Sequence, residues 1–452
     1  MSHWSEHSIF YHIYPLGCLG APLKNDQISP PIPRISELEQ WIPHLKELHI
    51  NALYLGPLFE STGHGYDTID YYRVDRRLGD NQTLQKTIEL LHHNGIKVIL
   101  DAVFNHSGRD FFAFRDLQRH TQQSAYRNWF TGIDFRSSSP CGDTFHYDGW
   151  NDHYDLVKLN LQNPEVVSYL LQAVTYWMEN FHIDGLRMDA ADCMDISFLQ
   201  TLNRHCKQID KDFWIMGEII HGDYSRWINC GALDSVTNYE CYKGLYSSHN
   251  DHNYFEIAYS LNRQFGTEGM YRHFLPYSFA DNHDVNRLTS ALTNPEHVFP
   301  LYCLLFSMPG IPSIYYGSEW GISGSRTATD DHALRPRLEP VHSSVNPPFE
   351  SLPAYIARLS EIRLHSHALQ HGAYRQVSVS SEQFAFLRQC EEETLLCVFN
   401  ASQHTAQMEI EGLPGTTARA KDLLSNTHWG MEQKRLSLNI PPSRGMIIAL
   451  EP

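Results

Sequence analysis

The sequence predicts an α/β protein in three parts: a TIM (β/α)8 barrel, a subdomain inserted after the third barrel strand, and a C-terminal antiparallel β-sandwich. Eight strand-like runs recur along most of the 452-residue chain, each followed by a helical pattern or a long loop. Repeated βα units form parallel sheets with right-handed crossovers, and eight of them close into a barrel. One long irregular segment interrupts the alternation, and near residue 371 the helical patterns give way to short strands.

The barrel elements are expected where short apolar runs alternate with amphipathic stretches. The expected strands are 9–16, 52–57, 97–105, 185–191, 213–219, 235–239, 277–281 and 313–316. The expected helices are 36–49, 81–94, 164–181, 196–209 and 347–369. Ser36 is the expected N-cap of the first helix, in which Leu38 and Ile42 fall near helical spacing.

The irregular segment and the change of pattern near the end of the chain set the expected domain boundaries. Residues 1–106 and 156–370 are assigned to the barrel, and 107–155, rich in aromatic residues, Ser, Gly and Asp, to the inserted subdomain. Residues 371–452 are assigned to the β-sandwich, a common size for a small domain. Its expected strands are 376–379, 384–388, 394–399, 405–410 and 446–450.

Composition narrows the class of protein. The formal charge of −17 argues against nucleic acid as a partner, because an acidic surface repels phosphate backbones. The nine cysteines show no CxxC pairing, and the 27 histidines show no metal-ligand spacing. The N-terminus lacks an apolar signal-peptide core, and the apolar runs fall short of the roughly 20 residues of a membrane span. We therefore expect a reduced, cytoplasmic protein without a membrane or nucleic-acid partner.

Polar side chains cluster at the predicted carboxyl ends of the barrel strands, where TIM barrels place their active sites. Strand 3 leads from Asp101 to His106, and strand 4 from Gly185 to Asp189. Strand 5 ends at Glu218 and strand 7 at the segment 281–284. Three carboxylates should therefore share one face with three basic side chains. The carboxylates are Asp189, Glu218 and Asp284, and the basic side chains are His106, His283 and Arg187.

This set of groups is the equipment for cleaving a glycosidic bond. One protonated carboxyl donates to the leaving oxygen, and one carboxylate attacks the anomeric carbon or activates water. Like charges in a crowded site keep one carboxyl protonated near neutral pH. Arg187 lies two residues before Asp189, on the same side of a strand, and is expected to hold Asp189 ionised as a nucleophile.

The chain resembles the α-amylase superfamily of retaining glycoside hydrolases over nearly its whole length. The matching segments occur in the family's order and are 64–71, 101–106, 185–189, 217–218 and 282–284. The resemblance implies that Asp189 is the nucleophile, Glu218 the acid/base and Asp284 a third carboxylate that stabilises the transition state. It also implies sugar-binding roles for six other side chains: Tyr66, His106, Arg187, His283, Asp331 and Arg335.

Two segments resemble the neopullulanase and cyclomaltodextrinase group of this family. Residues 156–160 are similar to its Met-Pro-Lys-Leu-Asn, and 217–221 to its Gly-Glu-Ile-Trp-His, with Ile220 in place of Trp. That group carries an N-terminal domain for which the sequence leaves no room before strand 1, so its dimerisation and cyclodextrin preference are not carried over. The Asp-rich calcium loop of some relatives is replaced by 16–22, so no metal is expected there.

The resulting hypothesis is a hydrolase of α-1,4 bonds in maltodextrins or cyclomaltodextrins, with α-1,6 activity left open. No cofactor is expected, the expected partner is an oligosaccharide, and the oligomeric state is open. Transglycosylation is an alternative, because a dry acceptor site would favour a sugar hydroxyl over water. A non-catalytic glycan-binding protein is a second alternative, which the presence of all three carboxylates disfavours.

Overall fold

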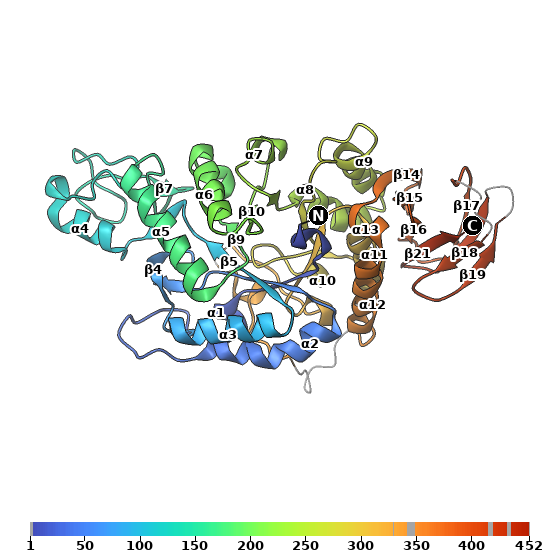
Figure 1. Cartoon of the computed structure of the whole chain (residues 1–452), viewed down its shortest axis with the longest axis horizontal. Coiled ribbons are helices and arrows are strands. Elements are labelled where there is room, and N and C mark those ends of the chain that lie inside the picture. The colour runs from blue at the N-terminus through green and yellow to red at the C-terminus, as the bar shows by residue number, and fades with distance from the viewer. Residues whose placement is uncertain (1–2, 329, 341–348, 415–418, 432–434, 452) are drawn as a thin grey trace.

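An eight-stranded parallel sheet forms the centre of the molecule (Figure 1). The computed structural model describes residues 3–328, 330–340, 349–414, 419–431 and 435–451. In spatial order the strands are β11 (Ser235–Val236), β10 (Trp214–Gly217), β9 (Gly185–Met188), β5 (Lys97–Ala102), β2 (Ala52–Leu55), β1 (Phe10–Ile13), β13 (Ile311–Tyr315) and β12 (Tyr277–Phe279). A parallel bridge between Thr237 and Tyr277 joins the two end strands, so the sheet closes into the predicted TIM barrel.

Large side chains fill the barrel interior, as expected for a packed core rather than a pore. The inward-facing cluster contains Phe10, Ala52, Tyr54, Ile99, Trp214, Met216, Tyr277, Phe279 and Ile311. Trp4, on the 3-10 helix η1 (Trp4–His7), packs against Phe10 and Trp214. The floor of the barrel is therefore aromatic, and polar side chains gather at the carboxyl ends of the strands.

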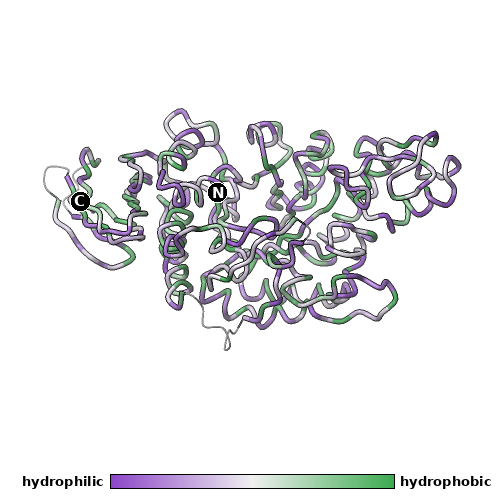
Figure 2. The backbone as a smooth tube through the Cα atoms, turned by 180° about the vertical axis from the view of Figure 1, so that it is seen from behind, coloured by the Kyte–Doolittle hydropathy of each residue, from purple (hydrophilic) through white to green (hydrophobic). Residues whose placement is uncertain are grey.

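Helices surround the barrel; most bury one face, whereas α11 (Val298–Ser307) is buried on all sides. The longer ones are α3 (Asn81–His93), α5 (Pro164–Phe181), α6 (Ile196–Ile209), α8 (Tyr239–Asn250), α9 (Phe255–Phe265), α11 (Val298–Ser307) and α12 (Leu352–His365). Figure 2 shows hydrophobic and hydrophilic stretches alternating along the chain, as one-sided burial requires. The side chains of Asn163 and Asp195 cap α5 and α6, so both helices begin and end as predicted. No helix in the described part of the chain is long and apolar enough to cross a membrane.

The segment between β5 and β9 carries its own small sheet. Its strands are β6 (His106–Gly108), β8 (His153–Lys158) and β7 (Gly149–Trp150), and it also contains helix α4 (Phe112–His120). Strand β6 pairs with β8, which brings His106 opposite Lys158. In Figure 1 this segment and the C-terminal strands lie at opposite ends of the molecule.

Two antiparallel sheets form the C-terminal sandwich. The larger contains β14 (Ala373–Val379), β15 (Gln383–Gln389), β16 (Thr394–Asn400), β21 (Arg444–Glu451), β18 (Arg419–Asp422) and β19 (His428–Gly430). The smaller pairs β17 (Ala406–Ile410) with β20 (Leu436–Ile440). Side chains from both sheets share one buried cluster, including Leu396, Ile410 and Leu438. The sandwich is therefore an independent core, and the predicted fold class is confirmed.

Several predicted elements differ from the structure. The helix expected at 36–49 is a 3-10 helix, η2 (Arg34–Trp41), followed by α2 (Ile42–Glu47), because Pro43 fits only in a first helical turn. Ser36 donates to the carbonyl oxygen of Pro33 instead of capping a helix. The start of the helix expected at 347–369 lies outside the described residues. In the structure α12 runs from Leu352 to His365, and Ser366 then caps a second, short helix, α13 (His367–His371). Strand β11 is shorter than expected, since the chain turns at Asn238 into α8.

Candidate active site

Two acidic side chains follow neighbouring barrel strands. Asp189 comes directly after β9, and Glu218 directly after β10. The parallel register continues past both strands: the Asp189 N–H donates to the Ala102 carbonyl (3.1 Å), and the Glu218 N–H to the Met188 carbonyl (3.0 Å). Both residues are only 8% exposed. The barrel thus brings these two carboxylates side by side at its carboxyl end.

Arg187 lies beneath the two carboxylates and contacts both. Its Nη1 is 2.9 Å from Oδ1 of Asp189, and its Nη2 is 2.8 Å from Oε1 of Glu218. The same Nη1 is 2.8 Å from Oδ1 of Asp101, at the end of β5. The guanidinium is almost fully buried, and three carboxylates therefore share one positive charge.

The electrostatic balance differs from the sequence-based expectation. Burial raises the pKa of Asp189 well above its usual value and also raises the pKa of Glu218; Arg187 opposes both shifts. Arg187 lowers the pKa of Asp189, in the expected direction, but burial outweighs it and the charges of Glu218, Asp101 and Asp284 add to the upward shift, so the expectation that Arg187 alone keeps Asp189 ionised is wrong. Asp101 and Glu218 in turn hold the pKa of Arg187 above its usual value, against the effect of burial. The cluster consequently holds a proton to higher pH than an isolated carboxyl would.

Asp284 is the third carboxylate and lies in the loop after β12. Its Oδ2 is 2.9 Å from Nε2 of His283, and its Oδ1 accepts a hydrogen bond from Nη2 of Arg335 (2.9 Å). Burial would raise the pKa of Asp284, but His283 and Arg335 outweigh it and hold this pKa well below its usual value. Asp284 is therefore ionised at neutral pH.

Tyr66, in the turn between β3 (Phe59–Ser61) and β4 (Thr68–Val74), extends the cluster on the opposite side. Its hydroxyl contacts Nε2 of His283 and donates to Oδ2 of Asp101 (3.0 Å). Its ring stacks on His283 with the ring centroids 5.5 Å apart. The ring is thus held through its hydroxyl and by stacking on His283, which suits it to act as a rigid platform.

His106 occupies the wall formed by the inserted segment. Its Nε2 is buried, has no hydrogen-bond partner among the described residues, and lies 3.9 Å from Oδ2 of Asp189. Burial, helped by His64, lowers the pKa of His106 to about 3, so the ring is neutral at physiological pH. The ring of Trp150 lies 5.8 Å away, and its Nε1 is likewise buried without a partner in the described part of the chain. These two nitrogens are positioned to meet a ligand.

Asp331 and Arg335 form the ion pair that the sequence suggests, with 2.8 Å between Nη2 and Oδ2. Arg335 also donates from Nε to the His283 carbonyl (3.0 Å), which ties the pair to the Asp284 loop. Asp330, Asp331 and His332 are the one group of potential metal ligands found among the described residues, and Asp331 is already engaged. The absence of a metal from the site stays a prediction.

Four further side chains of the site were assigned no role from the sequence, although Asn282 lies in one of the matching segments. Tyr14 stacks on His283 at 5.8 Å, and the Tyr54 hydroxyl donates to Asp101 (2.8 Å). Tyr239 and Asn282 lie beside Glu218 and form a hydrogen bond with each other (3.1 Å). Their signal was their position, since all four lie at or just after the carboxyl end of a barrel strand.

The side of the site beyond Glu218 is formed by short loops. Ile220 is 39% exposed, and its N–H approaches Oδ2 of Asp192 (3.5 Å). Cys193 is exposed, yet partial burial and the charge of Asp192 raise the pKa of its thiol to about 11. A thiolate nucleophile is therefore disfavoured. Trp227 and Trp320 are both buried.

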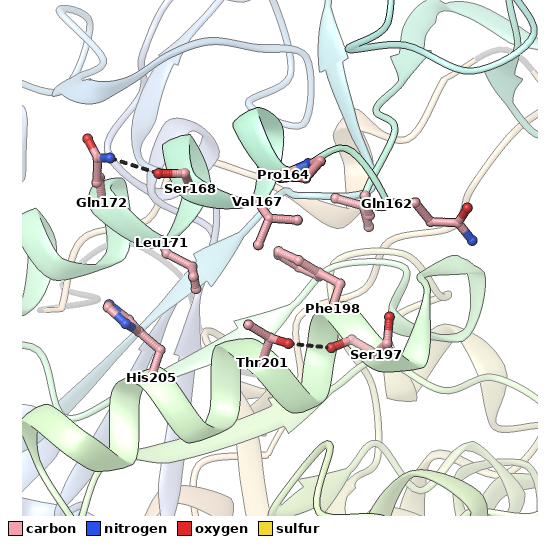
Figure 3. Close-up of a pocket in the computed structure, with 11 residues that line it drawn as sticks. Gln162, Pro164, Val167, Ser168, Leu171, Gln172, Ser197, Phe198, Thr201 and His205 are labelled. Carbon is pink, nitrogen blue, oxygen red and sulfur yellow. Dashed lines mark hydrogen bonds between the residues drawn. The ribbon is translucent and has the colours of Figure 1, made fainter.

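A separate hollow of about 610 Å³ lies between α5 and α6 (Figure 3), and none of the three clustered carboxylates lines it. Leu171, Val167 and Phe198 form its apolar side, and Gln172, Thr201 and His205 contribute polar groups. It contains no acidic side chain, so it lacks the groups that glycosidic cleavage requires.

Comparison with known proteins agrees with this geometry. Residues 38–344 match the model of the α-amylase catalytic domain, and 374–447 the model of the maltogenic amylase C-terminal domain. A cyclomaltodextrinase of a Bacillus species is 30% identical over 88% of this chain and 73% of its own length. Neopullulanase 2 of Thermoactinomyces vulgaris is 31% identical over 98% of this chain and 78% of its own length.

A solved structure of a cyclomaltodextrinase superposes with a TM-score of 0.86 at 26% identity, covering 99% of this chain and 78% of the other. The matched catalytic-domain model spans more than half of the chain and includes all three clustered carboxylates. The chain therefore belongs to the α-amylase family of glycoside hydrolases, as its sequence motifs and the carboxylate cluster at the end of its barrel both indicate.

Proposed function

We propose that this glycoside hydrolase cleaves α-1,4-glucosidic bonds of maltodextrins and cyclomaltodextrins with retention of configuration, using Asp189 as nucleophile and Glu218 as acid/base. The observation that carries the assignment is the single guanidinium of Arg187 in contact with both carboxylates. Such close placement favours the retaining geometry, in which the carboxyl groups are about 5–5.5 Å apart, over the wider inverting geometry.

In the first step, protonated Glu218 donates its proton to the glycosidic oxygen while an Asp189 oxygen attacks the anomeric carbon. The carbon–oxygen bond to the leaving sugar breaks, and a glycosyl ester of Asp189 forms. The raised pKa of Glu218 supports its part, because a general acid must hold its proton near the working pH. When Glu218 carries the proton, the positive charge of Arg187 is shared by Asp189 and Asp101 alone.

In the second step, ionised Glu218 takes a proton from water as the water oxygen attacks the anomeric carbon. The bond to Asp189 breaks, and its carboxylate is regenerated. Asp284 is held ionised by its two basic neighbours and stabilises the positive charge that develops on the sugar ring. The surroundings of Glu218 and Asp284 thus support the tasks proposed for them.

The remaining site residues bind the sugar. Tyr66 offers its ring to the sugar at the cleavage position, and the buried, unpartnered Nε2 of His106 bonds to a sugar hydroxyl. His283 binds the hydroxyls on the other side and orients Asp284. The Asp331–Arg335 pair holds the next sugar towards the non-reducing end, and its side chains are partly exposed, as a subsite requires.

The relatives' names support short α-glucans as substrates, and the neopullulanase relative supports including α-1,6 bonds. Transglycosylation on the same substrates is the competing activity. The exposed, apolar Ile220 favours it to some degree, because a drier acceptor side lowers the advantage of water.

Domain division and location are further parts of the proposal. We assign 1–106 and 156–370 to the catalytic barrel, 107–155 to the inserted subdomain and 371–452 to the sandwich; the separate sandwich core supports the last boundary. All nine cysteines are free, which supports a reducing compartment such as the cytoplasm.

A product time-course tests the proposed function. The protein is incubated with maltoheptaose, β-cyclodextrin or pullulan, with Glu218→Gln as the control. Short maltooligosaccharides from the first two, absent with the variant, are expected. Products longer than the starting chain would assign transglycosylation instead, and no reaction on any substrate would contradict the α-glucan assignment.

A further inference from the structure

Beyond the residues assigned so far, Glu218 is held by three donors from three different elements. Its Oε2 accepts the backbone N–H of Ala190 (3.0 Å). Its Oε1 accepts from Nη2 of Arg187 (2.8 Å) and from the hydroxyl of Tyr239 (3.3 Å). Arg187 lies on β9, Ala190 in the turn just after that strand, and Tyr239 is the first residue of α8.

The direction of the tyrosine hydrogen bond is fixed by its neighbours. The backbone N–H of Asp284 can only donate, so the atom of Asn282 that it contacts at 2.8 Å is the side-chain oxygen. The amide nitrogen of Asn282 must then face Tyr239, to whose oxygen it donates (3.1 Å). The tyrosine proton is left to point at Glu218, which completes a chain of donors from the Asp284 loop to Oε1 of Glu218.

We propose that Tyr239 is a positioning residue for the acid/base: its hydroxyl, held as a donor by Asn282, occupies Oε1 of Glu218 and leaves Oε2 to carry the catalytic proton. Oε1 already receives two donors and Oε2 only one, so a proton is accommodated at Oε2 with less loss of hydrogen bonding. The inference rests on the proposed role of Glu218 and adds how that group is oriented.

The surroundings keep Tyr239 in this role. Asn238 caps α8, and its amide bonds to Gln264 (2.9 Å), which fixes the start of the helix. The Tyr239 ring packs edge-on against Phe279, with the centroids 5.1 Å apart. Burial, helped by the charges of Glu218 and Asp284, raises the pKa of Tyr239 well above its usual value, so its hydroxyl remains a donor over the working pH range.

The charged and titratable groups that face Glu218 are few. Arg187 and Asp189 approach from β9 and its end, His283 and Asp284 from the loop after β12, and Tyr239 from α8. Arg187 stabilises the ionised form, and the two carboxylates disfavour it. Tyr239 adds a neutral donor to the ionised form, and removing that donor should raise the pKa of Glu218.

The test is Tyr239→Phe, with Tyr242→Phe as the matched control. Tyr242 lies on the same helix, and its ring also packs against Phe279, at 5.2 Å, but no hydrogen bond from its hydroxyl to a carboxylate is found in the described part of the chain. Rates are measured across pH with maltoheptaose and with α-maltosyl fluoride, whose leaving group needs no proton. Thermal unfolding checks that each variant folds.

With maltoheptaose, the basic limb of kcat/KM for Tyr239→Phe should move to higher pH by roughly half to one unit, because that limb reports loss of the Glu218 proton. With the fluoride, Glu218 is needed only in the second step, as a base. The acid limb of kcat then reports protonation of Glu218, and it should also move to higher pH. Asn282→Ala should shift both limbs in that direction by less, and the double variant should add little to Tyr239→Phe.

The outcomes separate the two proposals. Limbs of Tyr239→Phe that coincide with those of Tyr242→Phe would overturn the positioning role, provided that Glu218→Gln is inactive on maltoheptaose. A Glu218→Gln variant that keeps full activity on maltoheptaose would instead overturn the proposed function itself. A loss of rate in Tyr239→Phe without any displacement of either limb would also reject the positioning role.

Discussion

The protein buries arginine in two contrasting regions. At the carboxyl end of the barrel, Arg187 contacts three carboxylates. At the junction of barrel and sandwich, Arg363 on α12 and Arg388 on β15 donate to backbone carbonyls. The carbonyls of Phe306, Met308 and Gly310 accept from Arg363, and those of Ser307 and Gly372 from Arg388. Neither forms an ion pair within the described residues.

The two regions show opposite electrostatics. Burial lowers the pKa of both Arg363 and Arg388, and for Arg363 the charge of Arg388 adds to the effect. Around Arg187 the surplus is negative, and it is the carboxylates whose pKa values are raised. The junction cations match the carbonyl dipoles at the end of α11 and join two cores, which is a structural task. The cluster around Arg187 keeps an excess of negative charge, which allows it to hold a proton for catalysis.

The largest expected effect is on activity. Arg187→Met should lower kcat/KM by at least about a thousand-fold, because Asp189 and Glu218 lose their common donor and their orientation. Arg388→Met should leave kcat/KM within about threefold of the parent, since its contacts are remote from the carboxylates. Steady-state rates on maltoheptaose for the two variants compare them directly. Equal losses would remove the functional distinction between the regions.

The free energy of unfolding of the same two variants should depend on pH in different ways. Without Arg187, the folded-state pKa values of the carboxylates rise further, so the folded state binds more protons than the unfolded one above the ordinary carboxyl pKa. Arg187→Met should therefore lose about 3–5 kcal/mol at neutral pH and recover part of it in acid. Arg388→Met should lose about 1–3 kcal/mol at either pH, because carbonyls do not titrate. Denaturant unfolding at the two pH values measures both.

A smaller effect on the free energy of unfolding is expected from neutralising Asp189, the proposed nucleophile. Asp189 has a raised folded-state pKa, so its ionised form destabilises the fold above the usual carboxyl pKa, and the penalty fades as the pH falls below it. Asp189→Asn should thus stabilise the protein by about 1 kcal/mol at neutral pH and by nothing in acid, while abolishing activity. Thermal unfolding in both buffers checks this. A variant less stable than the parent at neutral pH would contradict the surplus of negative charge.

The smallest expected effect lies at the rim of the site. Asp331 is partly exposed, and among the described residues Arg335 links it to the cluster. Asp331→Ala should raise KM for maltoheptaose by about two- to fivefold with little change in kcat, as a screened ion pair contributes less than about 1 kcal/mol. Initial rates over a range of substrate concentrations give both constants. A loss of kcat as large as that of Arg187→Met would move this pair into the reacting centre.

The sequence predicted the parts of the fold in which local signals agree. Helices α5 and α6 begin after capping side chains and keep an amphipathic pattern to their ends, so their bounds were predictable. The prediction failed at 36–49, where the apolar spacing masked the break imposed by Pro43. It also missed β20, whose alternation from Leu436 to Ile440 was a usable signal, and β18, whose polar residues gave none.

The sequence predicted which residues form the candidate site better than it predicted how their charges interact. Side chains at strand ends converge because parallel strands end on one face, and Asp189 and Glu218 follow from that rule alone. The sharing of Arg187 with Asp101 depends on the register between β5 and β9, which pairs Asp101 with Arg187 and which no sequence pattern specifies. Tyr239 reaches Glu218 only because β11 is short and α8 begins at once.

The most direct test of the account is to trap the glycosyl–enzyme and locate its bond. A maltosyl fluoride with fluorine next to the anomeric carbon slows both steps, and the second more, so the covalent intermediate should accumulate. Peptide mass spectrometry should then find one sugar ester, on the fragment containing Asp189, and none with Asp189→Asn. An ester on another residue, or no ester together with products of inverted configuration, would contradict Asp189 as the nucleophile of a retaining hydrolase.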